Sequence, residues 1–287
     1  MIIDLKQHPN EIVDADFAII GGGTVGLITA LELASKLPEK QIVVIESGYK
    51  FSEQSEIFEV NFKHSNYLGA IKGRFRGLGG TSARWGGAMI PMQPADWKDL
   101  DLGFELTDLY RHIERLEQIF GLPPGDYSAS IEDQFLGSPY TARLGKWPAF
   151  KNRNTYHIFK SRIRKLSNLK VYVNSHVTSF TQNSESDTQT ILALSENKNK
   201  LLVSTRNIIL CAGAIESTRL ALIYTENLGI EKPKGLGRFF SDHLAISVGY
   251  LRIADKIKQR VFNEAFSFRF EKNGTFRNIR FELNNDE

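Results

Sequence analysis

Hydrophobic periodicity divides the start of the chain into a strand, a helix and a second strand. Residues 15–20 form a short β-rich run, and residues 24–36 carry leucine and alanine at helical spacing. Residues 41–45 then return to a run of valine and isoleucine. Because a helix links two adjacent strands, this order predicts a β-α-β crossover with parallel strands.

Helical spacing returns twice further along the chain. Residues 107–120 place apolar side chains on one face and end at GLPPG, where glycine and proline are typical of a helix C-terminus. Residues 156–166 place Phe159, Ile163 and Leu166 on a common face. Both ranges therefore predict amphipathic helices.

Strand-like segments dominate the chain from residue 169 onward. LKVYV, VTSFT, TILAL and LLVST follow in quick succession, and polar linkers between the last three predict a β-meander. NIILCAGA is apolar enough for a parallel strand buried on both faces, and ESTRLALIYTE predicts a helix. From Leu244 alternating strand patterns return, and AFSFRFEKNGTFRNIRFEL predicts a hairpin that turns at Asn273-Gly274.

Bulk composition narrows the classes of partner and compartment. The net charge is +3 and 24% of the residues are charged, so the balance calls for neither a nucleic-acid nor a membrane partner. No apolar run approaches the roughly 20 residues that span a bilayer, and the first residues lack a signal-peptide pattern. Cys211 is the only cysteine, so an internal disulfide and a thiolate metal cluster are excluded, and its apolar surroundings predict a small core residue. We expect a soluble cytoplasmic protein with no metal site.

A glycine-rich turn joins the first predicted strand to the first predicted helix. Gly21, Gly23 and Gly26 fit the pattern G-x-G-x-x-G. In this pattern the first glycine allows a tight turn, the second lets a pyrophosphate approach and the third permits close packing of helix on strand. Thr24 and Val25 would begin the helix, whose N-terminus offers unpaired N–H groups and partial positive charge to phosphate. The turn therefore predicts a dinucleotide site.

An acidic residue lies at the expected distance from this turn. Glu46 follows Gly26 by about 20 residues and ends the second predicted strand, where a carboxylate can hold ribose hydroxyls. The glycine pattern and Glu46 agree on a dinucleotide, but they do not separate NAD from FAD.

A second glycine-rich stretch, GRFRGLGGTSARWGG at residues 73–87, points to flavin. Its part LGGTSARWGGAMI resembles the second glycine-rich motif of the glucose-methanol-choline (GMC) oxidoreductases. The resemblance implies that backbone N–H groups lie along the FAD pyrophosphate, that two hydroxyls add donors, and that the next segment passes the isoalloxazine ring. The residues in these three roles are Gly79 and Gly80, Thr81 and Ser82, and Trp85, Gly86 and Gly87.

Three further motifs resemble the same family in order and spacing, and the resemblance extends over residues 14–250. VYVNSHVTSF resembles the adenine-contacting strand, with His176 and Val177 at the contact. NIILCAGAIESTRLAL resembles the Ala-Gly-Ala turn, which places Ala212 and Gly213 at the cofactor. GLGRFFSDHL resembles the stretch that leads into the substrate domain.

The resemblance implies an activity and a mode of cofactor binding. A GMC oxidoreductase oxidises the CH–OH group of an alcohol or sugar by hydride transfer to FAD, so the implied partner is a small alcohol or sugar. Some sugar-oxidising members attach FAD through a histidine just before the tryptophan of the motif. Arg84 stands there in this chain, so we expect non-covalent FAD.

The fold class that follows is α/β, with two domains. An FAD-binding Rossmann-like domain, with a parallel sheet and a β-meander, comprises residues 1–87 and 151–245. Residues 88–150 and 246–287 form part of a substrate or cap domain that begins an antiparallel sheet. Exposed strands of that partial sheet would favour self-association.

The catalytic base of the family has no match in this sequence. In GMC enzymes a histidine from a C-terminal segment serves as the base, and nothing after residue 250 resembles that segment. The last histidine, His243, does not match the family's base and is only a fallback candidate, so we expect this chain to be inactive, or nearly so, by itself. Two alternatives stay open: a non-catalytic FAD-binding remnant or partner subunit, and an NAD-dependent flavoprotein reductase. A second G-x-G-x-x-G would favour the reductase, and the sequence contains none.

Overall fold

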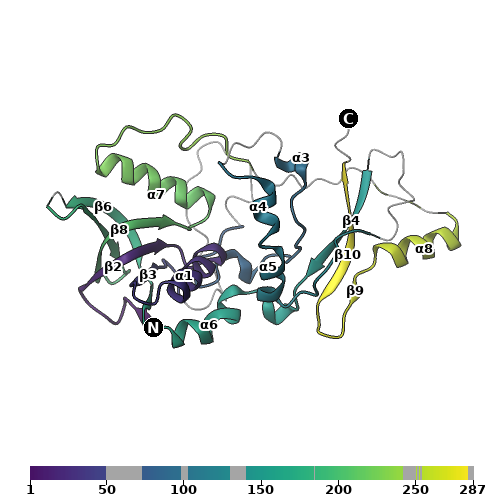
Figure 1. The fold of residues 1–287 in the computed structure, drawn as a ribbon, viewed down its shortest axis with the longest axis horizontal. Helices are drawn as coiled ribbons and strands as arrows, with labels where there is room; N and C mark the ends of the chain where they lie inside the picture. The colour runs from purple at the N-terminus through teal and green to yellow at the C-terminus, as the bar shows by residue number, and fades with distance from the viewer. Residues whose placement is uncertain are drawn as a thin grey trace. The chain divides into compact units, whose positions relative to one another are not determined.

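The computed structural model describes residues 1–49, 73–97, 103–129, 140–183, 185–241, 250, 252 and 254–283. The chain separates into two compact units, whose elements are drawn in Figure 1. Unit 1 comprises Met1–Trp85 and Asn154–Asp242, and unit 2 comprises Gly86–Arg153 and His243–Glu287. The predicted domain boundaries follow residues 87, 150 and 245, whereas the units change after residues 85, 153 and 242.

Unit 1 is built on a sheet that has seven strands within the described residues, in the order β1-β5-β3-β2-β8-β7-β6. The strands β1, β5, β3, β2 and β8 are parallel neighbours, and β8, β7 and β6 form an antiparallel meander. In chain order they are β1 Ile2–Asp4, β2 Glu11–Ile20, β3 Ile42–Ile45, β5 Leu169–Val173, β6 His176–Asn183, β7 Thr188–Leu194 and β8 Lys200–Leu210. The predicted α/β fold with a parallel sheet and a β-meander is therefore confirmed.

Three helices pack on the described part of this unit. Helix α1 (Thr24–Lys36) packs on β3 and β5, and α6 (Thr155–Lys165) packs on α1. Helix α7 (Ala214–Asn227) packs on β6 and β8, and its Tyr224 ring meets Phe180 edge-on with 5.3 Å between the ring centroids. Strand β3 is buried at every position because it lies inside the parallel sheet, as its run of valine and isoleucine predicts.

Strand β8 joins two segments that the sequence pattern separates. The prediction of separate strands at LLVST and NIILCAGA is wrong, because β8 runs unbroken from Lys200 to Leu210. Two polar residues near its middle stay in the strand because they bond to β2. Thr205 Oγ1 and Asn207 Nδ2 both donate to the carbonyl oxygen of Asp16, at 3.3 and 2.9 Å.

Unit 2 contains an antiparallel sheet, three-stranded within the described residues, in the order β4-β10-β9. The strands are β4 Tyr140–Trp147, β9 Arg269–Phe270 and β10 Phe276–Leu283. The predicted hairpin turn is confirmed, since Gly274 has a φ of +81° and the Glu271 N–H donates to the Thr275 carbonyl at 2.8 Å. Strand β4 pairs with β10 along its whole length, and the sequence pattern does not predict a strand at residues 140–147.

One helix prediction and one strand prediction in unit 2 need correction. The helix expected at 107–120 is two helices, α4 (Leu106–Tyr110) and α5 (Ile113–Phe120), separated by a turn at Arg111 and His112. Lys256–Phe266 forms helix α8 where alternating strands are expected. The Asp255 carboxylate caps this helix by accepting two N–H bonds of its first turn, at 2.8 and 3.1 Å. Three short elements complete the described part of the chain. Helix α3 (Pro94–Trp97) and the 3₁₀ turn Phe150–Asn152 belong to unit 2, and the 3₁₀ turn Gly80–Ala83 belongs to unit 1.

Candidate functional site

A pocket of about 220 Å³ lies at the carboxyl ends of the parallel strands of unit 1. It begins where β2 ends at Ile20, where β3 ends at Ile45, and where β8 gives way to Cys211. Ligands of open α/β sheets bind at this edge, because helix N-termini and turns converge there. The lining includes most of the residues that the sequence motifs assign to a cofactor. They are Gly21, Gly23, Thr24, Val25, Glu46, Gly80, Thr81, His176, Val177, Ala212 and Gly213.

The first glycine loop (residues 21–26) leads from β2 into α1 and forms part of the wall of the pocket. Gly23 is the N-cap residue of α1, and no described side chain caps this helix end. A Cβ on Gly23 would approach no described atom more closely than Gly80 Cα, at 3.9 Å, so the way to these N–H groups is open. Val25 in the first turn lines the pocket and is 64% exposed although it is apolar. An uncapped helix N-terminus beside open space suits an anionic group such as phosphate.

Gly26 lies outside the lining and shows the close packing that the motif predicts for its third glycine. A Cβ on Gly26 would overlap the carbonyl oxygen of Gly21 and lie 3.3 Å from Cys211 Cβ. A larger residue would therefore push α1 away from the end of β2.

The second glycine loop (residues 73–87) packs on the first, backbone against backbone. The Gly79 N–H donates to the Gly22 carbonyl at 2.8 Å, and the Gly80 N–H donates to the Gly77 carbonyl at 2.8 Å. Both N–H groups have partners within the protein, and their contact with the FAD pyrophosphate stays a prediction. Gly79 has a φ of +92°, and a Cβ there would overlap the side chain that caps α6. These glycines allow close contact between segments of the protein itself.

The two hydroxyl residues of this loop have different surroundings. Thr81 is exposed and lines the pocket, in the position that its predicted role requires. Ser82 is buried, and its Oγ donates to the Gly79 carbonyl at 2.5 Å and accepts from the Thr155 N–H at 3.1 Å. Ser82 therefore ties the loop to the start of α6, and its bond to a phosphate stays a prediction.

The tryptophan end of the second glycine loop lies outside the described pocket lining. Trp85 is half-buried and ends the first segment of unit 1, whereas Gly86 and Gly87 begin unit 2. Their contacts with the isoalloxazine ring stay predictions. His243 lies outside the described residues.

Glu46 follows β3 and bonds to both glycine loops. Its side chain is buried, with the residue 6% exposed. Oε2 accepts the Gly22 N–H at 2.7 Å, and Oε1 accepts the N–H groups of Gly48 at 2.8 Å and Gly77 at 3.0 Å. The sequence identifies Glu46 as a candidate, but its three backbone partners emerge from the tertiary structure.

A charged wall, which the sequence motifs do not single out, completes the pocket. Arg76, Glu216 and Arg219 line it, and the buried Glu216 accepts from Arg219 Nε at 2.8 Å. Burial, with the positive charges of Arg219 and Arg76, lowers the pKa of His176 below its ordinary value, so this ring is neutral at neutral pH. The i, i+3 spacing of Glu216 and Arg219 at the start of the predicted helix is the sequence signal that could have found this pair.

Cys211 also lines the pocket, which corrects its placement inside a strand as a core residue. It lies one position past β8 and is half-buried. Burial raises the pKa of its thiol, so the reactive thiolate is scarce at neutral pH.

Comparison with known proteins identifies the fold. No family model and no curated protein matches this chain. A formate oxidase structure aligns with a TM-score of 0.51 and 17% identity, over 75% of this chain and 48% of its own. A variant of the Aspergillus oryzae RIB40 formate oxidase, described for its effect on FAD modification, aligns with a TM-score of 0.52 and 16% identity over the same shares. Pyridoxine 4-oxidase from Mesorbium loti aligns with a TM-score of 0.50 and 18% identity, over 71% of this chain and 50% of its own.

The fold is that of the GMC oxidoreductases. The resemblance that the motifs indicate is thus confirmed at the level of the fold. The chain spans about half the length of these solved structures.

All described residues that line the pocket of this GMC fold belong to unit 1. Across the part of the chain that the structure describes, no helix is long and apolar enough to cross a bilayer. The same residues contain no group of three or more His, Cys, Asp or Glu side chains placed to hold a metal ion.

Proposed function

We propose that this chain forms the FAD-binding portion of a GMC-type oxidoreductase that oxidises the CH–OH group of a small alcohol or sugar. The observation that carries the proposal is the pocket at the carboxyl ends of β2, β3 and β8. The uncapped N-terminus of α1, Glu46 and the second glycine loop all line this pocket. The fold is shared with a formate oxidase and a pyridoxine 4-oxidase, and one formate oxidase structure is described in terms of FAD modification.

The residues of the pocket fit the adenosine diphosphate half of FAD. The open N–H groups at the start of α1 suit a pyrophosphate, and Thr81 adds a hydroxyl. Glu46 suits a ribose hydroxyl, while Val177 and Ala212 offer apolar contacts to adenine. At about 220 Å³ the pocket is smaller than the roughly 300–1,000 Å³ of sites that enclose a whole drug-sized ligand. It therefore accommodates part of FAD, and we assign the flavin end to Trp85, Gly86 and Gly87 on the motif resemblance.

Bound FAD would supply the redox chemistry, as the acceptor for a hydride from the CH–OH carbon. The protein has to position the cofactor and take the hydroxyl proton. His176 lies at the proposed adenine end, and His243 lies outside the described residues, so neither is assigned as the base. FAD binding without turnover, by a remnant or a partner subunit, is the competing proposal.

We propose that FAD is held without a covalent bond. Arg84 stands where some sugar-oxidising family members carry the histidine that attaches flavin. Its guanidinium lies over the Phe75 ring, 5.2 Å from the ring centroid. Because arginine stays protonated, its guanidinium is a poor nucleophile for attachment to flavin.

The single cysteine offers a direct test of the pocket assignment. Cys211 lines the pocket, so bound FAD should shield its thiol from an alkylating reagent. The FAD-free chain is alkylated with and without FAD, and mass spectrometry measures the rate, at a pH near the ordinary thiol pKa of about 8.5. We expect FAD to slow the reaction about tenfold or more. The control is the chain unfolded in urea, in which FAD should have no effect.

Other outcomes of the same experiment discriminate between the proposals. Protection by NADH but not by FAD would favour an NAD-dependent reductase, and protection by neither would remove the dinucleotide site. Flavin that stays on the unfolded chain would contradict non-covalent binding. Adding alcohols or sugars to the FAD-loaded chain without air separates turnover, which bleaches the flavin, from binding alone.

A further inference from the structure

Three loops of unit 1 meet at a single carboxylate. Glu46 Oε2 accepts from Gly22 in the first glycine loop, and Oε1 accepts from Gly77 in the second glycine loop and from Gly48 after β3. The three donor–acceptor distances are 2.7, 3.0 and 2.8 Å, which are those of well-formed bonds to a charged acceptor. One side chain thus joins both glycine loops to the end of β3.

The backbone of Glu46 adds a fourth segment to this junction. Its N–H donates to the Tyr172 carbonyl at 2.8 Å, and its carbonyl accepts from the Ser175 N–H at 2.9 Å. Ser175 precedes His176, so the turn between β5 and β6, which also lines the pocket, is tied to the same residue.

The loops around this carboxylate are packed too closely for side chains. A Cβ on Gly48 would overlap the backbone nitrogen of Gly77, and a Cβ on Gly22 would lie 2.7 Å from Leu78 Cδ2 and 3.2 Å from Glu46 Cβ. The Gly79 N–H closes the contact by donating to the Gly22 carbonyl. Glycine at positions 22, 48 and 80 therefore permits this close contact, since a Cβ on Gly80 would lie 3.0 Å from Gly23 Cα.

The charge of Glu46 is compensated by amide groups. Within the described residues no Lys, Arg or His nitrogen lies within 4.0 Å of its carboxylate, and the residue is 6% exposed. A carboxylate offers about four acceptor sites. The amides of Gly48 and Gly77 occupy Oε1, from which Ser47 Oγ lies 3.5 Å, and the amide of Gly22 occupies one site of Oε2. One acceptor site of Oε2 therefore remains for a ribose hydroxyl.

We propose that Glu46 is a positioning residue whose carboxylate assembles both glycine loops in the cofactor-free protein. It affects cofactor binding through the geometry of those loops and of the α1 N-terminus, in addition to its contact with the ribose. The part of this inference that concerns FAD rests on the proposed function. The part that concerns the loops does not.

The test is amide hydrogen exchange on the full chain without FAD, comparing Glu46→Gln with the parent chain. An amide has the size of the carboxylate but presents an NH₂ group to at least one of the three N–H donors. We expect exchange in peptides containing Gly22 or Gly77 to rise about tenfold or more. Asp16→Asn is the matched control, because Asp16 also accepts a backbone N–H but touches neither glycine loop. It should leave these peptides unchanged.

Unchanged exchange in Glu46→Gln without FAD would overturn the proposal and leave Glu46 as a ribose ligand alone. If Glu46→Gln does not fold, Glu46→Asp serves in its place. This variant keeps the charge but is one methylene too short to reach both loops. Faster exchange in Glu46→Asp supports the proposal, and full protection overturns it.

Binding kinetics supply a readout that a loss of global stability does not move. If Glu46 orders the loops, Glu46→Gln should lower the association rate constant for FAD, because the loops must be ordered first. If it holds only the ribose, the dissociation rate constant should rise and association should stay as it is. A parent chain that binds no FAD, combined with faster exchange in Glu46→Gln, would defeat the proposed function while the junction stands.

Discussion

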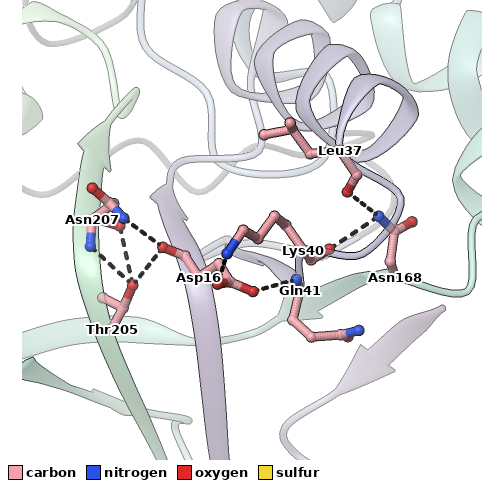
Figure 2. A network of polar contacts seen from close by, with 7 residues as sticks. All are labelled: Asp16, Leu37, Lys40, Gln41, Asn168, Thr205 and Asn207. Carbon is pink, nitrogen blue, oxygen red and sulfur yellow. Dashed lines mark hydrogen bonds and ion pairs between the residues drawn. The ribbon is translucent and has the colours of Figure 1, made fainter.

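Two carboxylates flank the parallel pair β2 and β3, and their surroundings differ. Asp16 stands where the pair begins and accepts the Gln41 N–H at 2.8 Å and Lys40 Nζ at 3.0 Å, as Figure 2 shows. Glu46 stands where the pair ends and accepts three backbone N–H groups. The Asp16 side chain is 35% exposed, whereas Glu46 is buried. The same functional group thus works at the surface in one place and inside a loop junction in the other.

The two ends of α1 also differ in whether a side chain bonds to their backbone groups. Near Asp16, the Asn168 side chain donates to carbonyl groups at and beyond the end of α1, among them those of Leu37 and Lys40 (Figure 2). Near Glu46, the start of α1 has no described side-chain cap and opens into the pocket. Among the described residues, side-chain bonds satisfy one end of the helix, and the N–H groups at the other end have no side-chain partner. This contrast distinguishes a region that stabilises the sheet from one that can bind a ligand.

Among the substitutions that test this comparison, we expect Glu46→Gln to lower the free energy of unfolding most. Breaking bonds to a buried carboxylate leaves amide groups without acceptors, so we expect a loss of about 3 kcal/mol in the free energy of unfolding. Urea titration followed by circular dichroism measures it. A loss no greater than that of Asp16→Asn would show that the two carboxylates are equivalent.

We expect a smaller loss of stability from a substitution where the segment after β3 touches the second glycine loop. Gly48→Ala places a Cβ on the backbone nitrogen of Gly77, so we expect a loss of about 2 kcal/mol together with weaker FAD binding. Gly86→Ala is the matched control, since no described atom lies within 4 Å of its Cβ. It should leave the stability of the FAD-free chain unchanged and lower FAD affinity if the flavin passes there. Unchanged affinity, measured by flavin fluorescence, would remove Gly86 from the proposed site.

Asn168→Ala tests the closed end of α1. The substitution removes the donor shared by three carbonyl groups, and we expect a loss of about 1–2 kcal/mol in the free energy of unfolding. Because this end lies away from the pocket lining, FAD affinity of the folded variant should match that of the parent chain. An equal loss of affinity would contradict the division of α1 into a structural end and a binding end.

The smallest effect concerns the pH dependence of Asp16. The Gln41 N–H, followed by Lys40, lowers the pKa of the Asp16 carboxyl below its ordinary value. Its stabilising contribution is therefore present above the unfolded-state pKa of about 3.9 and is lost as the pH falls through the lowered folded-state value. We expect Asp16→Asn to cost about 1 kcal/mol near pH 6 and less near pH 2.5, because the group is partly exposed. Urea midpoints at both pH values measure the difference, and a constant difference would assign the effect to packing.

Elements whose signals are local could be predicted from the sequence. The predicted helix 24–36 has the observed bounds of α1, because its periodicity and its glycine turn are both short-range features. The turn at Asn273-Gly274 is predicted for the same reason. Strand β4 and the continuity of β8 could not be predicted, because each depends on a partner strand far away in the chain. Helix α8 does carry a local signal, the N-cap residue Asp255, which the expectation of alternating strands overlooked. The pairing of β4 with β10 joins residues 140–147 to residues 276–283, and no pattern within either segment encodes it.

The sequence by itself determined which residues gather at the pocket. The glycine turn, Glu46, His176 and Ala212 each lie next to a strand end, and parallel strands end at a common edge, so their convergence follows from order along the chain. Only the tertiary structure decided which N–H groups are already bonded. Those of Gly79 and Gly80 bond within the protein, and Glu46 accepts three others. A hydrogen bond tolerates only a few tenths of an ångström of variation in its donor–acceptor distance. Motif spacing cannot predict the positions of two loops that are distant in sequence to that precision.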